Sequence, residues 1–152
     1  MGGPPGPPDE KHLLRSAGLR VTPQRLAILR CLRNTTSHPT PEAVYRRLLP
    51  DFPGLSPNTV YLTLRTLEEA GLLRRISLEG SVQRYDADVT PHVHLVCRRC
   101  GRVDDCDGGL VPLLRGLGEA VRDKVGPTGW EIGAQDSCFY GLCPKCRQAP
   151  DG

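Results

Sequence analysis

Two C-x-x-C pairs constrain this chain more than any other feature of its sequence. One pair is CRRC at 97–100 and the other is CPKC at 143–146. The two-residue gap lets both sulfurs of a pair reach one ion, and two pairs supply the four thiolates of a tetrahedral zinc site. Two separate redox or disulfide pairs are the alternative. We expect one structural Zn²⁺ per subunit, bound by Cys97, Cys100, Cys143 and Cys146.

The cellular location of the protein favours either a zinc site or disulfides for these cysteines. The chain has 152 residues and seven cysteines, and it opens with MGGPPGPP rather than with a charged and apolar leader. We therefore expect a reducing, cytoplasmic location, in which metal binding is favoured over disulfides. No apolar run approaches the roughly 18 residues that cross a bilayer, so no membrane association is expected. Residues 1–10, rich in glycine and proline, are expected to form a flexible tail.

Charge is distributed unevenly along the chain. Residues 11–84 hold twelve basic and five acidic side chains, a net charge of +7, whereas residues 85–152 hold eight basic and ten acidic ones, a net charge of −2. This asymmetry favours a nucleic-acid-binding N-terminal half joined to a half with another task. A solvated basic surface is the alternative.

Three dipeptides in the basic half, each a threonine or serine followed by proline, predict helix starts: Thr22-Pro23, Thr40-Pro41 and Ser56-Pro57. The hydroxyl caps the helix and proline suits its first position. A short helix at about 11–17 precedes them, and Gly71 should end the last one. Strands at 72–77 and 81–86 around a turn at 79–80 then complete a winged helix-turn-helix. A helical domain with an added hairpin is the alternative.

A second domain follows the segment DVTP at 88–91. We expect strands at 92–97, 102–106, 130–133 and 138–142, with one amphipathic helix between them. The apolar stripe of that helix is Leu110, Leu113, Leu114, Leu117, Val121 and Val125. The predicted fold class is therefore α+β, with a winged-helix DNA-binding domain at 11–88, an α/β domain carrying the zinc site at 89–147, and a tail at 148–152.

A second metal site is suggested by His92-Val93-His94. On a strand both imidazoles point to one face, and Asp86 and the pair at 104–105 are near in sequence. Nitrogen and oxygen donors of this kind suit Fe²⁺, Mn²⁺ or Zn²⁺. His38, which precedes the helix capped by Thr40, is a further candidate. Ordinary buried or solvent-facing histidines are the alternative.

The helix that starts at Ser56 carries Asn58, Tyr61 and Arg65 opposite its apolar stripe. Side chains of these types can hydrogen-bond base edges and phosphates, and the first turns of a recognition helix reach the bases. The alternative is an exposed polar face without a partner.

Several motifs, in order along the chain, resemble the ferric uptake regulator family. They are GLRVTPQR at 18–25, SHPT at 37–40, SPNTVY at 56–61, EAGL at 69–72, HVHLVCRRCG at 92–101 and YGLC at 140–143. The resemblance implies a homodimer in which winged-helix arms on a central dimerisation domain bind a palindromic double-stranded DNA operator. The expected DNA-binding residues are Arg20, Asn58, Thr59, Tyr61 and Arg65.

Within that family the chain is most similar to the peroxide-sensing branch. Asp105 stands where iron-uptake regulators typically carry glutamate, and the segment at 136–139 lacks a histidine that helps form their additional site. The resemblance implies that Fe²⁺ or Mn²⁺ is the regulatory ion, and that peroxide acting on the iron form oxidises His38 or His92. The implied regulatory ligands are His38, Asp86, His92, His94 and Asp105.

Other functions remain open at this point. An iron-, manganese- or zinc-uptake regulator of the same family would use the same ligands. A small metal hydrolase or thiol oxidoreductase is disfavoured, because four thiolates close one site and no general base is evident, so we expect no enzyme. A zinc-ribbon interaction module is a third possibility. Cys31 and Trp130 are expected in the cores of their domains, and Cys106 in strand packing, with no role assigned to Cys138.

Overall fold

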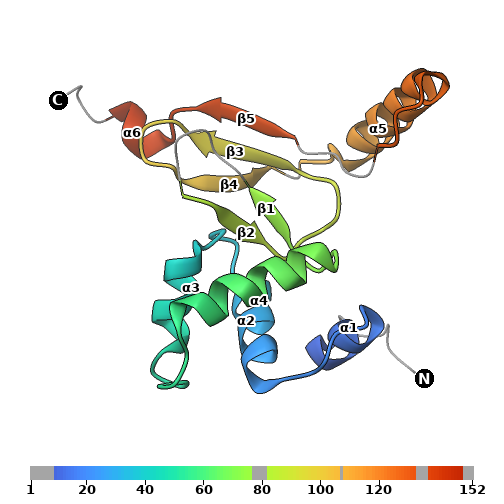
Figure 1. The fold of residues 1–152 in the computed structure, drawn as a ribbon. Coiled ribbons are helices and arrows are strands. Elements are labelled where there is room, and N and C mark those ends of the chain that lie inside the picture. The colour runs from blue at the N-terminus through green and yellow to red at the C-terminus, as the bar shows by residue number, and fades with distance from the viewer. Residues whose placement is uncertain (1–8, 77–81, 107, 133–136, 149–152) are drawn as a thin grey trace, which may run out of the picture. The chain divides into compact units, whose positions relative to one another are not determined.

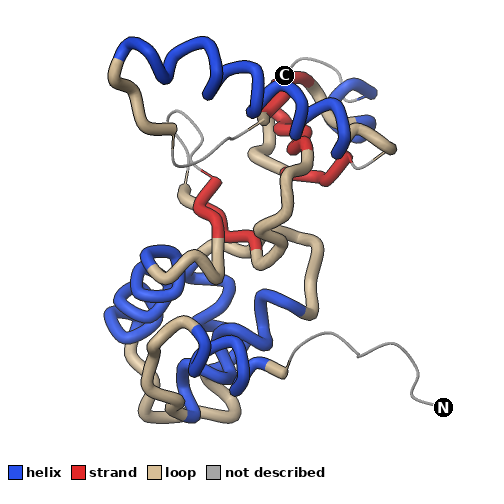
Figure 2. The backbone as a smooth tube through the Cα atoms, turned by 90° about the vertical axis from the view of Figure 1, so that its right-hand side faces the viewer, coloured by secondary structure: helices blue, strands red, loops and turns tan. Residues whose placement is uncertain are grey.

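The computed structural model describes residues 9–76, 82–106, 108–132 and 137–148, which divide into two compact units between Val89 and Thr90 (Figure 1). Helices, blue in Figure 2, make up most of the N-terminal unit, which is followed by a unit built around a β-sheet. The predicted α+β class is confirmed. In the part of the chain that is described, no helix is both long enough and apolar enough to cross a bilayer.

The N-terminal unit contains the helices α1 (Glu10–Ser16), α2 (Pro23–Arg33), α3 (Pro41–Leu48) and α4 (Pro57–Glu69). All three predicted caps are confirmed, because the hydroxyls of Thr22, Thr40 and Ser56 each accept the backbone N–H three residues on, at 3.1–3.2 Å. These bonds satisfy N–H groups that a helix start otherwise leaves without partners. The local sequence therefore sets where α2, α3 and α4 begin.

Gly71 ends α4 as predicted. It lies in the left-handed region at φ 71°, where a residue without a Cβ is favoured. Its N–H donates to the carbonyl of Glu68, and the next N–H, of Leu72, donates to the carbonyl of Leu67, both at 2.9 Å. This arrangement satisfies carbonyls at the end of the helix and turns the chain toward the first strand.

One apolar core joins the four helices to the strand pair. Leu14, Ile28, Val44, Val60 and Leu64 are fully buried there. The ring of Tyr85 and the thiol-bearing Cys31 pack into the same cluster, so the expected core position of Cys31 is confirmed.

A short antiparallel hairpin completes this unit. The strands β1 (Arg74–Ile76) and β2 (Arg84–Asp86) pair with Arg75 opposite Tyr85, and both are shorter than the strands predicted at 72–77 and 81–86. The predicted turn at 79–80 lies outside the described residues. Helices followed by this hairpin form the predicted winged helix-turn-helix.

The C-terminal unit is built on a three-stranded sheet of order β4-β3-β5. Its elements are β3 (Val93–Cys97), β4 (Val103–Cys106), α5 (Val111–Val125), the 3₁₀ helix η1 (Gly126–Thr128), β5 (Cys138–Gly141) and α6 (Pro144–Gln148). The central strand β3 pairs antiparallel with β4 and parallel with β5. Three of the four strands predicted here are confirmed.

The predicted strand at 130–133 is wrong over its described part, because residues 130–132 have no regular structure. The central strand β3 pairs with β4 on one edge and with β5 on the other, so this segment does not enter the centre of the sheet. Trp130 is 70% exposed and is not a core residue of its own chain.

Helix α5 matches the predicted amphipathic helix, but most of its apolar face is not covered by its own chain. Leu114 is buried, whereas Leu113 is 70%, Leu117 is 56% and Val121 is 40% exposed. Apolar surface gathered in this way marks an interaction site in soluble proteins.

Two leucines of α4 provide a test of the core. Leu64 is fully buried and Leu62 is 56% exposed. We expect Leu64→Ala to lower the free energy of unfolding by about 2–5 kcal/mol, because it removes buried methyl groups and leaves a cavity. The matched variant Leu62→Ala should change it by about 0.5 kcal/mol or less. Urea denaturation followed by far-UV circular dichroism measures both, and equal losses would contradict this core.

Candidate metal centres

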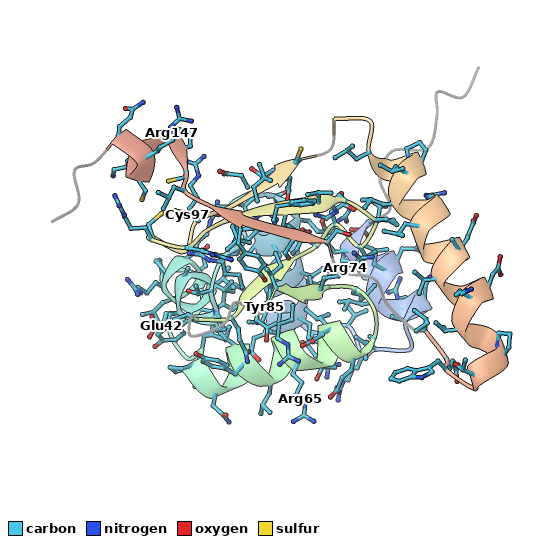
Figure 3. The ribbon with its side chains drawn as sticks, turned by 90° about the horizontal axis from the view of Figure 1, so that it is seen from above. Glu42, Arg65, Arg74, Tyr85, Cys97 and Arg147 are labelled. Atoms are coloured by element: carbon cyan, nitrogen blue, oxygen red, sulfur yellow. The ribbon has the colours of Figure 1, made fainter. Side chains whose placement is uncertain are left out.

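Four cysteines come together at one end of the sheet of the C-terminal unit. Their Sγ atoms all lie within 4.8 Å of one another, and the four residues are Cys97, Cys100, Cys143 and Cys146. Cys97 is labelled in Figure 3. We call this group the thiolate cluster. None of its members forms a disulfide. The Sγ atoms of Cys100 and Cys143 are 3.8 Å apart, close to the ~3.8 Å expected for sulfurs arranged tetrahedrally at ~2.3 Å from zinc.

Backbone hydrogen bonds shape both C-x-x-C turns. The N–H of Gly101 donates to the carbonyl of Cys97 at 2.9 Å, with Gly101 at φ 68°, which closes the turn after β3. The N–H of Arg98 donates to the carbonyl of Gly141, also at 2.9 Å. This bond continues the β3–β5 pairing, so the first turn lies against the start of the second.

The surroundings give the four thiols different acidities. The N–H of Cys143 donates to the Sγ of Cys97 at 3.3 Å, and together with the N–H of Cys100 it lowers the pKa of the Cys97 thiol to about 6. Burial raises the pKa of the Cys146 thiol to about 12. The protein therefore stabilises one thiolate with N–H donors, and a bound cation would stabilise the others. The cluster fits a structural metal ion.

A second group of donors lies on the same unit and consists of His92, His94 and Asp105, which we call the histidine cluster. The Nε2 atoms of His92 and His94 are 2.8 Å apart, and Asp105 Oδ1 lies 3.4 Å from the first and 3.7 Å from the second. The imidazoles are 6% and 2% exposed. Two buried imidazoles and the carboxylate of the more exposed Asp105 thus converge, as metal ligands do.

The tautomer of His92 suits metal binding. Its Nδ1 lies 2.9 Å from the carbonyl oxygen of Thr90, and a carbonyl can only accept, so Nδ1 carries the hydrogen. In the neutral ring Nε2 then presents its lone pair to His94 and Asp105. A hydrogen bond from the remote nitrogen of a ligating histidine is typical of metal sites.

The structure distinguishes Asp105 from its neighbour Asp104, which the residue pattern alone left open. Asp105 pairs in register with His94 across β3 and β4, so both side chains lie on one face of the sheet. Asp104 pairs with Leu95 on the other face, where it bonds the guanidinium of Arg102 at 2.8 Å. Asp105 is the carboxylate of the histidine cluster.

The N-terminal unit brings two further predicted ligands together. His38 Nε2 lies 3.7 Å from Asp86 Oδ2, and both residues are buried. The other carboxylate oxygen of Asp86 accepts the N–H of Asp88 at 2.8 Å, so a single oxygen faces the imidazole. We call these two residues the His38–Asp86 pair. Each unit therefore carries its own group of nitrogen and oxygen donors.

The predicted DNA-binding residues lie on the outer surface of the N-terminal unit. Asn58, Tyr61 and Arg65 are exposed on α4, and Figure 3 shows Arg65 projecting outward from this helix. Arg65 Nε bonds Glu69 at 2.8 Å. The Thr59 hydroxyl lies 2.8 Å from that of the capping residue Ser56, and Arg20 is exposed before α2.

Comparison with known proteins decides the family. Residues 16–110 match the model of the Ferric uptake regulator family. The chain is 34% identical over 134 residues to the Peroxide-responsive repressor PerR of Staphylococcus aureus, covering 88% of this chain and 86% of the relative. The chain belongs to the ferric uptake regulator family. It is therefore a metal-dependent transcriptional repressor of that family and not an enzyme.

Solved structures of the family share this fold. A peroxide stress regulator from Campylobacter jejuni is 30% identical, with a TM-score of 0.70 over 90% of this chain and 95% of that one. The ferric uptake regulator from Pseudomonas aeruginosa, solved with manganese, is 28% identical, with a TM-score of 0.67 over 89% of this chain and 98% of that one. The thiolate cluster and the histidine cluster of this family member both have the donor sets of metal sites.

Sequence reasoning missed three groups that support the ligands. The carbonyl of Thr90 orients His92, and Arg99 Nη1 donates to the carbonyl of Cys146 at 2.6 Å. Arg84 Nη1 donates to the carbonyl of His38 at 3.0 Å. No local pattern reveals bonds between residues as distant in sequence as His38 and Arg84.

Proposed function

We propose that this repressor senses peroxide through one regulatory Fe²⁺ ion, held jointly by the His38–Asp86 pair and the histidine cluster. The observation that carries the proposal is that each unit presents buried imidazole nitrogen with a carboxylate oxygen beside it: His38 with Asp86 in one, and His92 and His94 with the more exposed Asp105 in the other. Three imidazoles with two carboxylates suit Fe²⁺ or Mn²⁺, whereas the thiolate cluster suits Zn²⁺.

A shared ion gives the repressor its metal dependence. Ligands from both units would tie the DNA-binding unit to the C-terminal unit at one separation and angle. An ion shifts a conformational equilibrium only by its differential affinity for the two states. The ion binds more tightly where all five ligands reach it, so metal favours one arrangement of the DNA-binding units. We propose that this arrangement fits the operator.

The DNA-binding surface in this proposal is the exposed face of α4. Asn58 and Tyr61 lie in its first turns, where a recognition helix reaches base edges, and Arg65 supplies a charge for phosphate. Thr59 and the exposed Arg20 complete the set. The +7 charge of residues 11–84 supports binding to a polyanion.

We further propose that two copies of the chain form a homodimer that binds a palindromic operator, since a two-fold protein matches two-fold DNA. The uncovered apolar side chains of the C-terminal unit support this assembly. They are Leu113, Leu117 and Val121 of α5, with Trp130, Phe139 and Leu142, each at least 40% exposed. Packing against a second copy would remove them from water. Because chromosomal DNA is the proposed target, the expected location remains the cytoplasm.

The thiolate cluster is proposed to hold one structural Zn²⁺ per subunit. We expect Cys143→Ser to lose zinc and the dimer together, because the ion joins the ends of β3 and β5 and so supports the unit that carries the apolar face. The control is Cys138→Ser on β5, outside the cluster, which should keep one zinc per subunit. Elemental analysis and sedimentation velocity measure the two quantities. A zinc-free Cys143→Ser dimer of normal stability would contradict a structural role.

Binding to an operator fragment with Mn²⁺ tests the regulatory site. We expect metal-dependent affinity to fall ~10-fold or more in His92→Ala, because a ligand is lost, while far-UV circular dichroism is unchanged. His12→Ala is the matched control, since His12 lies exposed on α1. Unchanged affinity in His92→Ala would refute the proposed regulatory site. Fluorescence anisotropy with and without chelator provides the measurement.

Peroxide sensing has its own test. Fe²⁺, when bound, would supply the one-electron chemistry that activates hydrogen peroxide. The net change would be insertion of one oxygen atom into an imidazole C–H, in which the imidazole is oxidised by two electrons and one water is released. We expect mass spectrometry of the iron-loaded protein after peroxide to find this oxygen on His38 or His92, and the Mn²⁺-loaded protein to remain unmodified. Oxidation confined to cysteines would contradict the histidine-oxidation model and leave an iron-, manganese- or zinc-uptake regulator as the alternative.

A further inference from the structure

His38 has an unusual backbone conformation. Its φ is 48°, the one positive value at a non-glycine position in the described ranges 9–76, 82–106, 108–132 and 137–148. A residue with a Cβ rarely adopts this left-handed region, because the Cβ approaches the following carbonyl. The residue is also 2% exposed. Local preference therefore does not hold His38 in place, and contacts from elsewhere in the fold must do so.

These contacts come from β2, far along the chain. The guanidinium Nη1 of Arg84 donates to the carbonyl of His38 at 3.0 Å, and the N–H of Tyr85 donates to the carbonyl of Pro39 at 3.2 Å. Arg84 and Tyr85, which are consecutive in β2, thus donate to the carbonyls of the consecutive residues His38 and Pro39. The Tyr85 bond is made by backbone and would survive most substitutions, whereas the Arg84 bond depends on its side chain and is charge-assisted, hence stronger.

The next residue of β2 supplies the carboxylate that faces the imidazole. Asp86 Oδ2 lies 3.7 Å from His38 Nε2, and its Oδ1 is engaged by the N–H of Asp88. One three-residue strand therefore positions both the backbone of His38 and the oxygen opposite its ring. The ring of Tyr85, 3% exposed, anchors this strand in the core.

We propose that Arg84 is a positioning residue for the regulatory ion. Its bond to the His38 carbonyl holds that residue in the left-handed conformation from which the imidazole meets Asp86. Arg84 binds no ion itself and acts through His38. The inference rests on the proposed function, since it takes His38 and Asp86 to be ligands of that ion.

The test is Mn²⁺ affinity of the full chain with its thiolate cluster filled by zinc, measured from the electron paramagnetic resonance signal of free Mn²⁺. Arg84→Met keeps much of the aliphatic stem and removes the donor, and we expect binding ~10-fold or more weaker, as for other residues that support a ligand. Arg75→Met is the matched control. Arg75 lies on the same hairpin and bonds Glu68 at 3.1 Å, so this variant loses the same charge but should bind within ~2-fold of the unsubstituted chain.

A double-mutant cycle shows whether Arg84 acts through His38. In a His38→Ala background, Arg84→Met should have no further effect beyond ~2-fold, because the group that it positions is absent. The inference is overturned if Arg84→Met binds Mn²⁺ normally, or if it weakens binding equally with and without His38, which would indicate general damage to the fold.

Failure of the inference can be told apart from failure of the proposed function. If His38→Ala weakens Mn²⁺ binding and Arg84→Met does not, Arg84 has no positioning role and the ion site stands. If His38→Ala itself binds Mn²⁺ as tightly as the unsubstituted chain, the proposed ion site fails, and the role of Arg84 fails with it.

Discussion

The convergence of four cysteine sulfurs at one end of the sheet is the strongest constraint on the C-terminal unit. Its buried interior is small, formed by a few aliphatic side chains such as Val93, Val96 and Val103, and it also contains the imidazoles of His92 and His94. So little apolar burial gives a small domain limited stability. The parallel pairing of β3 and β5, which joins segments distant in the sequence, ends at the thiolate cluster. An ion there would stabilise the pairing that the core supports only weakly.

The central strand β3 connects the histidine cluster with the thiolate cluster. β3 carries His94 near its start and Cys97 at its end, and both of its edges are paired. Its register with β4 places Asp105 beside His94. With zinc bound as proposed, the C-terminal end of β3 would be held in place, and the strand would support the nitrogen and oxygen donors near its start.

The N-terminal unit is organised differently, around an apolar core that needs no ion. The helices α2, α3 and α4 pack their leucines, isoleucine and valines together, and the exposed side of α4 is left for polar residues. The ligands proposed for the regulatory ion, His38 and Asp86, lie outside this apolar cluster, and Asp86 belongs to β2. The unit therefore holds the exposed face of α4 on an apolar core that contains none of the proposed metal ligands.

The sequence by itself determined the features that depend on a few neighbouring residues. Thr22, Thr40 and Ser56 set helix starts because each hydroxyl bonds an N–H three residues away. C-x-x-C spacing lets two sulfurs reach one ion as soon as the backbone between them turns. Tertiary structure alone decided that Asp105 rather than Asp104 faces the histidines, that residues 130–132 find no strand to pair with, and that α5 leaves its leucines exposed. It also decided that Arg84 bonds the carbonyl of His38. These outcomes depend on which distant segments become neighbours, and no local spacing encodes a register between strands or a contact between residues far apart in the chain.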